Sequence, residues 1–165
     1  MQARFQPLTK RFVVFVLTLA TGLSIVLARK IYTNRQGLFV YAAYNGNVTL
    51  MRLTSVLGVD INAPGCDYGS CWNALSAAIN GHHPAAARYL LDQGADANAF
   101  ATRRPRIRVL TLASYYGDVE TVRLLLAHGA DVHFANSERE TALTIAIQRE
   151  NDEVVALLRQ AGAKQ

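Results

Sequence analysis

Charged residues are scarce in this chain, and their placement sets the first limits on its class. Only 18% of the 165 residues are charged while 51% are hydrophobic, which is too apolar for a wholly disordered protein. The first thirty positions hold no acidic residue but five basic ones: Arg4, Lys10, Arg11, Arg29 and Lys30. From residue 31 onward, twelve basic and twelve acidic residues cancel. The net charge of +5 therefore comes from the N-terminal segment and does not indicate a nucleic-acid-binding surface.

Catalytic signatures are also missing. The sequence contains no G-x-S-x-G, no phosphate-binding glycine loop, no H-E-x-x-H and no dinucleotide-binding glycine pattern. Its four histidines fall at turns or helix ends of the repeat described below: His82, His83, His128 and His133. We therefore expect no enzymatic activity, no catalytic residue, no cofactor and no small-molecule substrate.

A long apolar run lies near the N-terminus. Residues 12–28, FVVFVLTLATGLSIVLA, carry no charge and are apolar on every helical face. As a helix, these seventeen residues would rise about 26 Å, close to a hydrocarbon core of roughly 30 Å, and Arg11 and Lys30 can reach the headgroups at either end. We predict a transmembrane anchor here, between a basic flank at 1–11 and a linker at 29–36.

Two outcomes are open for this run. Retention makes the chain a single-pass protein of a bacterial inner membrane, with its C-terminal domain facing the periplasm. Cleavage as a signal peptide after Ala28, in the sequence Val26-Leu27-Ala28, leaves a soluble periplasmic protein. No cysteine lies near the run, which excludes a lipoprotein anchor.

Four segments of the chain share one internal register. In each, a large apolar residue precedes an alanine by three positions, and a glycine follows that alanine by sixteen: Phe39/Ala42/Gly58, Leu75/Ala78/Gly94, Leu110/Ala113/Gly129 and Leu143/Ala146/Gly162. The alanines allow helices to approach closely, and a glycine can end a helix in the left-handed conformation. The register predicts a stack of helical hairpins, because one hairpin cannot bury its own apolar face.

The ends of these segments carry the most specific motif. Residues 90–98, LLDQGADAN, match the L-L-x-x-G-A-D-x-N end of the ankyrin repeat, and residues 125–133 differ from it only at the last position. The T-P-L-H start is degraded, and only Thr141 keeps its threonine. The chain thus resembles the ankyrin-repeat family over residues 37–165.

The resemblance implies an all-α ankyrin-repeat solenoid behind one N-terminal transmembrane or signal helix. It implies four helical-hairpin repeats, at about 37–63, 73–99, 108–134 and 141–165, joined by short β-hairpin-like connectors. The register glycines are 36, 35 and 33 residues apart, so the first two connectors are longer than the 33-residue period requires. Insertions of this kind often lie on the binding face.

The first long connector contains the only two cysteines, Cys66 and Cys71. In an exported domain such a pair predicts a disulfide, and two unpaired small residues are the alternative. A zinc site would need two further ligands, so we expect no metal.

The second long connector contains four arginines: Arg103, Arg104, Arg106 and Arg108. One interpretation is a cationic tip that meets an acidic partner or membrane headgroups. The other is a solvated loop whose arginines pair with carboxylates such as Asp67 or Glu138.

Aromatic residues mark the other candidate contacts. Tyr44, Tyr115 and Tyr116 fall at the ends of predicted first helices, and Trp72 lies in the first connector. Aromatic side chains are enriched among the residues that dominate binding energy. We expect a non-enzymatic protein-interaction module with an unidentified protein partner. The alternative is a cognate inhibitor, such as an immunity protein that binds one secreted toxin or enzyme.

Overall fold

The computed structural model of this chain describes residues 34–67, 70–101 and 106–164. Residues Arg35–Gln165 form one compact unit. The predicted anchor or signal segment at 12–28 lies outside the described residues. Within the described ranges, no helix is long and apolar enough to cross a membrane.

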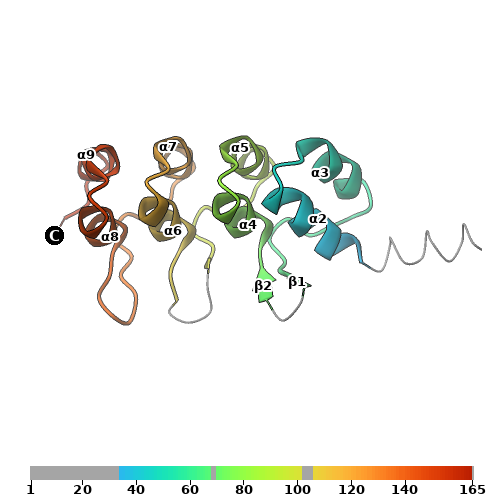
Figure 1. The fold of residues 1–165 in the computed structure, drawn as a ribbon, viewed down its shortest axis with the longest axis horizontal. Coiled ribbons are helices and arrows are strands. Elements are labelled where there is room, and N and C mark those ends of the chain that lie inside the picture. Colours follow the sequence, from blue (N-terminus) through green and yellow to red (C-terminus); the bar gives the residue numbers. More distant parts are fainter. Residues whose placement is uncertain (1–33, 68–69, 102–105, 165) are drawn as a thin grey trace, which may run out of the picture. The chain divides into compact units, whose positions relative to one another are not determined.

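Helical hairpins make up the compact unit, as the register predicts. The described residues contain eight helices: α2 (Arg35–Tyr44), α3 (Val48–Ser55), α4 (Ala74–Asn80), α5 (Pro84–Asp92), α6 (Val109–Tyr116), α7 (Val119–Ala127), α8 (Ala142–Gln148) and α9 (Asp152–Gln160). The first helices of the hairpins, α2, α4, α6 and α8, form one layer, and the second helices form the other (Figure 1). Each helix packs on its counterpart in the next repeat.

The residues of the sequence register form the core. Phe39, Leu75, Leu110 and Leu143 are fully buried, and so are the four alanines that follow them by three positions. Alanine has no side chain beyond Cβ, so neighbouring first helices can approach closely at these points. In the second helices, Leu125 and Leu158 are fully buried as predicted, whereas Leu157 is half-buried.

The helix ends follow from local sequence. All four register glycines have positive φ, from 72° at Gly58 to 95° at Gly162, so each ends its second helix in the left-handed conformation as predicted. At the start of α8, Thr141 and Thr144 form a capping box, in which each hydroxyl accepts from the backbone N–H of the other residue. The one threonine kept from the degraded start motif is therefore a helix cap.

The first connector is a true β-hairpin. Strand β1 (Gly65–Asp67) pairs antiparallel with β2 (Ser70–Trp72), and the register sets Cys66 opposite Cys71. The other two connectors each close with one antiparallel bridge, Phe100 with Arg108 and Ala135 with Thr141. All three project beyond the layer of first helices, which confirms the predicted hairpin-like connectors (Figure 1).

Two asparagines join successive repeats. The side-chain oxygen of Asn62 accepts from the Asp96 N–H at 2.8 Å, and its amide nitrogen donates to the Gly94 carbonyl at 3.3 Å. Asn98 makes the same pair of bonds one repeat later, to Asp131 at 2.8 Å and Gly129 at 3.1 Å. These asparagines form a ladder that satisfies the backbone where each second helix ends.

Candidate partner-binding face

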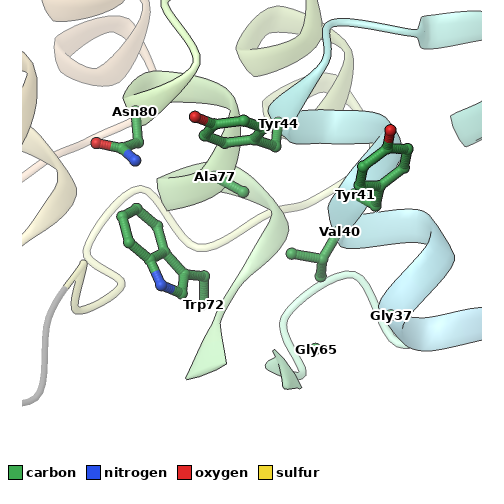
Figure 2. A pocket seen from close by; sticks show the side chains of 8 residues that line it. All are labelled: Gly37, Val40, Tyr41, Tyr44, Gly65, Trp72, Ala77 and Asn80. Atoms are coloured by element: carbon green, nitrogen blue, oxygen red, sulfur yellow. The ribbon is translucent and has the colours of Figure 1, made fainter. Parts of the chain in front are cut away.

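A groove lined by aromatic side chains lies between the first two repeats. It has a volume of about 290 Å³, and eight residues line it: Gly37, Val40, Tyr41, Tyr44, Gly65, Trp72, Ala77 and Asn80. Figure 2 shows the rings of Tyr44 and Trp72 on either side of Ala77. Tyr41 and Tyr44 are exposed and Trp72 is half-buried. We call these eight residues the aromatic groove. None of them is charged.

Close backbone approach at two glycines shapes the groove. A Cβ added to Gly65 would lie 2.7 Å from Cγ2 of Val40, so only glycine lets the first connector lie this close to α2. A Cβ added to Gly81 would lie 2.1 Å from the Tyr44 carbonyl oxygen, where the end of α4 meets the end of α2. Both distances are far below any ordinary carbon contact.

Tyr116 connects the aromatic groove to the third repeat. Its hydroxyl donates to the side-chain oxygen of Asn80 at 2.5 Å, and its ring meets the His82 ring edge-on at 4.6 Å. Tyr115 is next to it, with ring centroids 5.3 Å apart. The Arg149 guanidinium then lies 3.6 Å from the Tyr115 ring centroid. The four predicted aromatic residues thus belong to one set of contacts that reaches from α2 to the end of α8.

Sequence reasoning overlooked Tyr41, Asn80 and Arg149. Tyr41 precedes Tyr44 by three residues in α2 and therefore shares its side of the helix. Asn80 holds the same repeat position as Tyr44 and Tyr115, 36 residues after the first and 35 before the second. These spacings were available in the sequence. The stacking of Arg149 on Tyr115 had no such signal, because it depends on the fit between two repeats.

The arginine-rich connector is partly described. Arg103 and Arg104 lie outside the described residues. Arg106 is exposed, with its guanidinium 4.1 Å from the Phe100 ring centroid.

Arg108 is held within the domain. Its Nη1 donates to the Asn98 side-chain oxygen at 2.8 Å and lies 3.3 Å from an Asp131 carboxylate oxygen. Its guanidinium lies over the Phe134 ring, 4.3 Å from the centroid. The Arg108 charge is therefore paired with Asp131 and joins two repeats. This carboxylate is neither of the two that the sequence suggested as partners for the connector.

The cysteine pair is described only by its backbone. Cys66 and Cys71 are opposite each other in the hairpin register, but the structure does not describe a bond between their side chains. Among the described residues, no group of three or more His, Cys, Asp or Glu side chains is placed to hold a metal ion.

The geometry defines a class before any comparison is made. Four stacked helical hairpins, joined by projecting connectors and carrying an aromatic groove on the first-helix layer, are a helical-repeat protein. Comparison with known proteins then supports the family: residues 102–165 match the ankyrin repeats family, in three copies. Ankyrin repeats indicate a protein–protein interaction module and imply protein partners, and the family is generally non-enzymatic.

The chain is also similar to part of a much longer curated protein. It is 32% identical over 152 residues to an L-asparaginase of Dirofilaria immitis. The alignment covers 73% of this chain but 25% of that protein, so the chain spans about a quarter of its relative's length.

Proposed function

We propose that this chain is a non-enzymatic module that binds a protein partner through the aromatic groove and its extension to Tyr115. One observation carries the proposal: Tyr41, Tyr44 and Trp72 line a single groove with no charged residue in its lining. Large aromatic groups without neighbouring charges are typical of the centre of a protein interface. The partner segment is accordingly apolar or aromatic where it meets the groove.

Photocrosslinking tests this site directly. A benzoylphenylalanine placed at Tyr44 or at Trp72 of the full chain should capture the partner in cells. The control is the same group at Ala85, which is exposed on α5 in the layer of second helices. Equal capture at Ala85, or none at either groove position, would overturn the proposed site.

We also propose that the domain is tethered to or exported across a bacterial inner membrane and faces the periplasm. The apolar run at 12–28 and its basic flanks support this proposal. Retention of the full chain in membranes after alkaline washing tests the tether. Protease digestion of spheroplasts tests the side: the repeat domain should be cut in intact spheroplasts and protected in inverted vesicles. Release by alkali with a shortened N-terminus would instead support a cleaved signal peptide.

A cognate inhibitor is the second candidate. The exposed guanidinium of Arg106, held over Phe100 at the tip of a lengthened connector, supports it. This candidate requires one partner with nanomolar affinity, whereas a scaffold binds several partners more weakly. Changing Arg103, Arg104 and Arg106 to Glu while keeping Arg108 reverses the tip charge without breaking the Arg108 contacts. Full retention of every partner by this variant would exclude an acidic ligand for the tip.

Asparaginase activity is not proposed for this chain. The aligned part is a quarter of the relative's length, and the activity in its name belongs to that whole protein. We propose no cofactor and no small-molecule substrate.

A further inference from the structure

The first repeat exposes apolar side chains at positions that the later repeats bury. Tyr41 of α2 is 58% exposed, yet its equivalents one, two and three repeats later are all buried: Ala77, Leu112 and Ile145. Leu53 of α3 is 64% exposed, whereas its equivalent Leu124 is buried. In repeats two to four these positions face the preceding repeat.

Two more apolar residues extend this surface. Leu38 is half-buried, while its equivalents Ala74, Val109 and Ala142 are buried. Val56 follows Leu53 by three residues and is 85% exposed. We call Leu38, Tyr41, Leu53 and Val56 the end face. A contiguous exposed apolar surface of this kind marks an interaction site.

A further ankyrin repeat is not the occupant that the backbone prepares for. In the later repeats, the asparagine of the preceding repeat accepts from the Asp96 and Asp131 N–H groups. At the first repeat, Gln36 takes this place: its side-chain oxygen accepts from the Asp60 N–H at 3.2 Å. Its nitrogen donates to the carbonyls of Asp60 at 2.8 Å and Ala63 at 3.0 Å. The asparagine ladder is therefore closed within this repeat, while the apolar end face beside it stays exposed.

The charge around the end face favours an anionic surface. The first acidic residue of the whole sequence is Asp60, so α2 and α3 contain none. Both helices carry an arginine, Arg35 and Arg52, and Arg29 and Lys30 precede them in the sequence. By contrast, each of the other second helices carries at least one carboxylate, and α9 begins with two. The first repeat is thus basic and apolar, whereas the last repeat begins its outer helix with acid.

Chain length favours the same partner. The apolar run ends at Ala28 and α2 begins at Arg35, and seven residues of chain span at most about 25 Å. If the run is in a bilayer, the first repeat is the one that this tether holds beside the lipid. It is also the repeat that exposes tyrosine, leucine and valine together with arginine. This composition suits the interface of an anionic membrane, where aromatic and basic groups meet the headgroups and apolar groups enter below them.

We infer that the end face docks on the surface of an anionic bilayer, so that the first repeat rests on lipid and the aromatic groove beside it stays open for the partner. The inference rests on the proposed membrane tether. Docking through four apolar groups and a few arginines is weak alone and is made effective by the high local concentration that the tether provides.

A matched pair of labels tests the docking in the full chain. With Cys66 and Cys71 changed to Ser, one new cysteine is placed either at Thr49 or at Ala85. These exposed positions are equivalent in α3 and α5, and Thr49 adjoins Leu53 and Val56 on its helix. Each protein is labelled with a polarity-sensitive fluorophore and reconstituted in phosphatidylethanolamine/phosphatidylglycerol vesicles. We expect a spin-labelled lipid to quench the label at position 49 at least threefold more strongly than the label at position 85.

Two further arms separate the explanations. Leu53→Asp should abolish the excess quenching at position 49 while the chain still resists alkaline extraction. Replacing phosphatidylglycerol by phosphatidylcholine, or raising salt, should reduce it. Equal quenching at both positions with an alkali-resistant chain overturns the docking and leaves the tether intact. If the unlabelled Thr49→Cys protein forms a disulfide-linked dimer and its labelled form shows no lipid quenching, a second copy covers the end face and the docking is overturned. A chain that alkali removes from the vesicles overturns the tether and the docking together.

Discussion

Replacing Asn98 with alanine tests how successive repeats are held together. The side-chain oxygen of Asn98 accepts from the Asp131 N–H and from Arg108 Nη1, each at 2.8 Å, and its nitrogen donates to the Gly129 carbonyl at 3.1 Å. Alanine removes all three bonds. It leaves a backbone donor and a backbone acceptor of the next repeat without their side-chain partner.

The size of the effect follows from these bonds. Each neutral hydrogen bond contributes about 1 kcal/mol net, and one to a charged group about 1.5–3 kcal/mol. Asn98 is half-buried, so water replaces only part of this, and we expect the variant to lose about 2–4 kcal/mol of unfolding free energy. Asn62 is the matched control, because it makes the two backbone bonds but has no arginine partner and is exposed. Asn62→Ala should cost about 1–2 kcal/mol.

Urea unfolding of the full chain in mild detergent, followed by far-ultraviolet circular dichroism, measures both variants. The transition midpoint should fall more for Asn98→Ala than for Asn62→Ala, with an unchanged denaturant dependence. Arg108→Ala should shrink the difference between them, because the two residues are coupled. If both asparagine variants lose less than about 1 kcal/mol, the side-chain ladder is not what couples the repeats. Equal losses would show that the Arg108 link contributes nothing.

Three other changes have defined outcomes. Glu150 has φ of 58°, so Glu150→Gly should raise the unfolding free energy by about 0.5–1 kcal/mol, the left-handed cost less the entropy of glycine; a lower midpoint would contradict this. Thr141→Ala removes the capping box of α8 and should lower the same free energy by about 1–2 kcal/mol, whereas Thr141→Ser should retain most of it. Cys66 and Cys71 should resist alkylation in unfolded, unreduced protein from periplasm and react after reduction, because their backbones are paired across the hairpin; modification before reduction would exclude the disulfide.

The hairpin stack was predictable from sequence because its causes are local. The buried alanine, the glycine with positive φ and the threonine cap each act within one hairpin, and the spacing of alanine and glycine repeats four times. The placement of the binding residues was predictable only in part. Tyr44 and Trp72 could be named as candidates, but their positions across one groove depend on the close approach of Gly65 to Val40.

Arg108 illustrates the limit most clearly. In the sequence it is one of four arginines in a connector, with nothing to distinguish it from the exposed Arg106. In the structure it bonds to Asn98 and Asp131 and packs on Phe134, because the hairpin bends back over the next repeat. Similarly, the exposure of Leu53 follows from what stacks beside it, since the equivalent Leu124 has the same chemistry and is buried.

The sequence by itself thus determined the period, the helix ends and the apolar stripe of each repeat, because these depend on residues within one hairpin. Only the tertiary structure decided which charges are paired, which aromatic rings share a groove and which apolar face is left exposed. Those features arise from lateral contacts between repeats, where residues about 35 positions apart meet across an interface that no local pattern encodes.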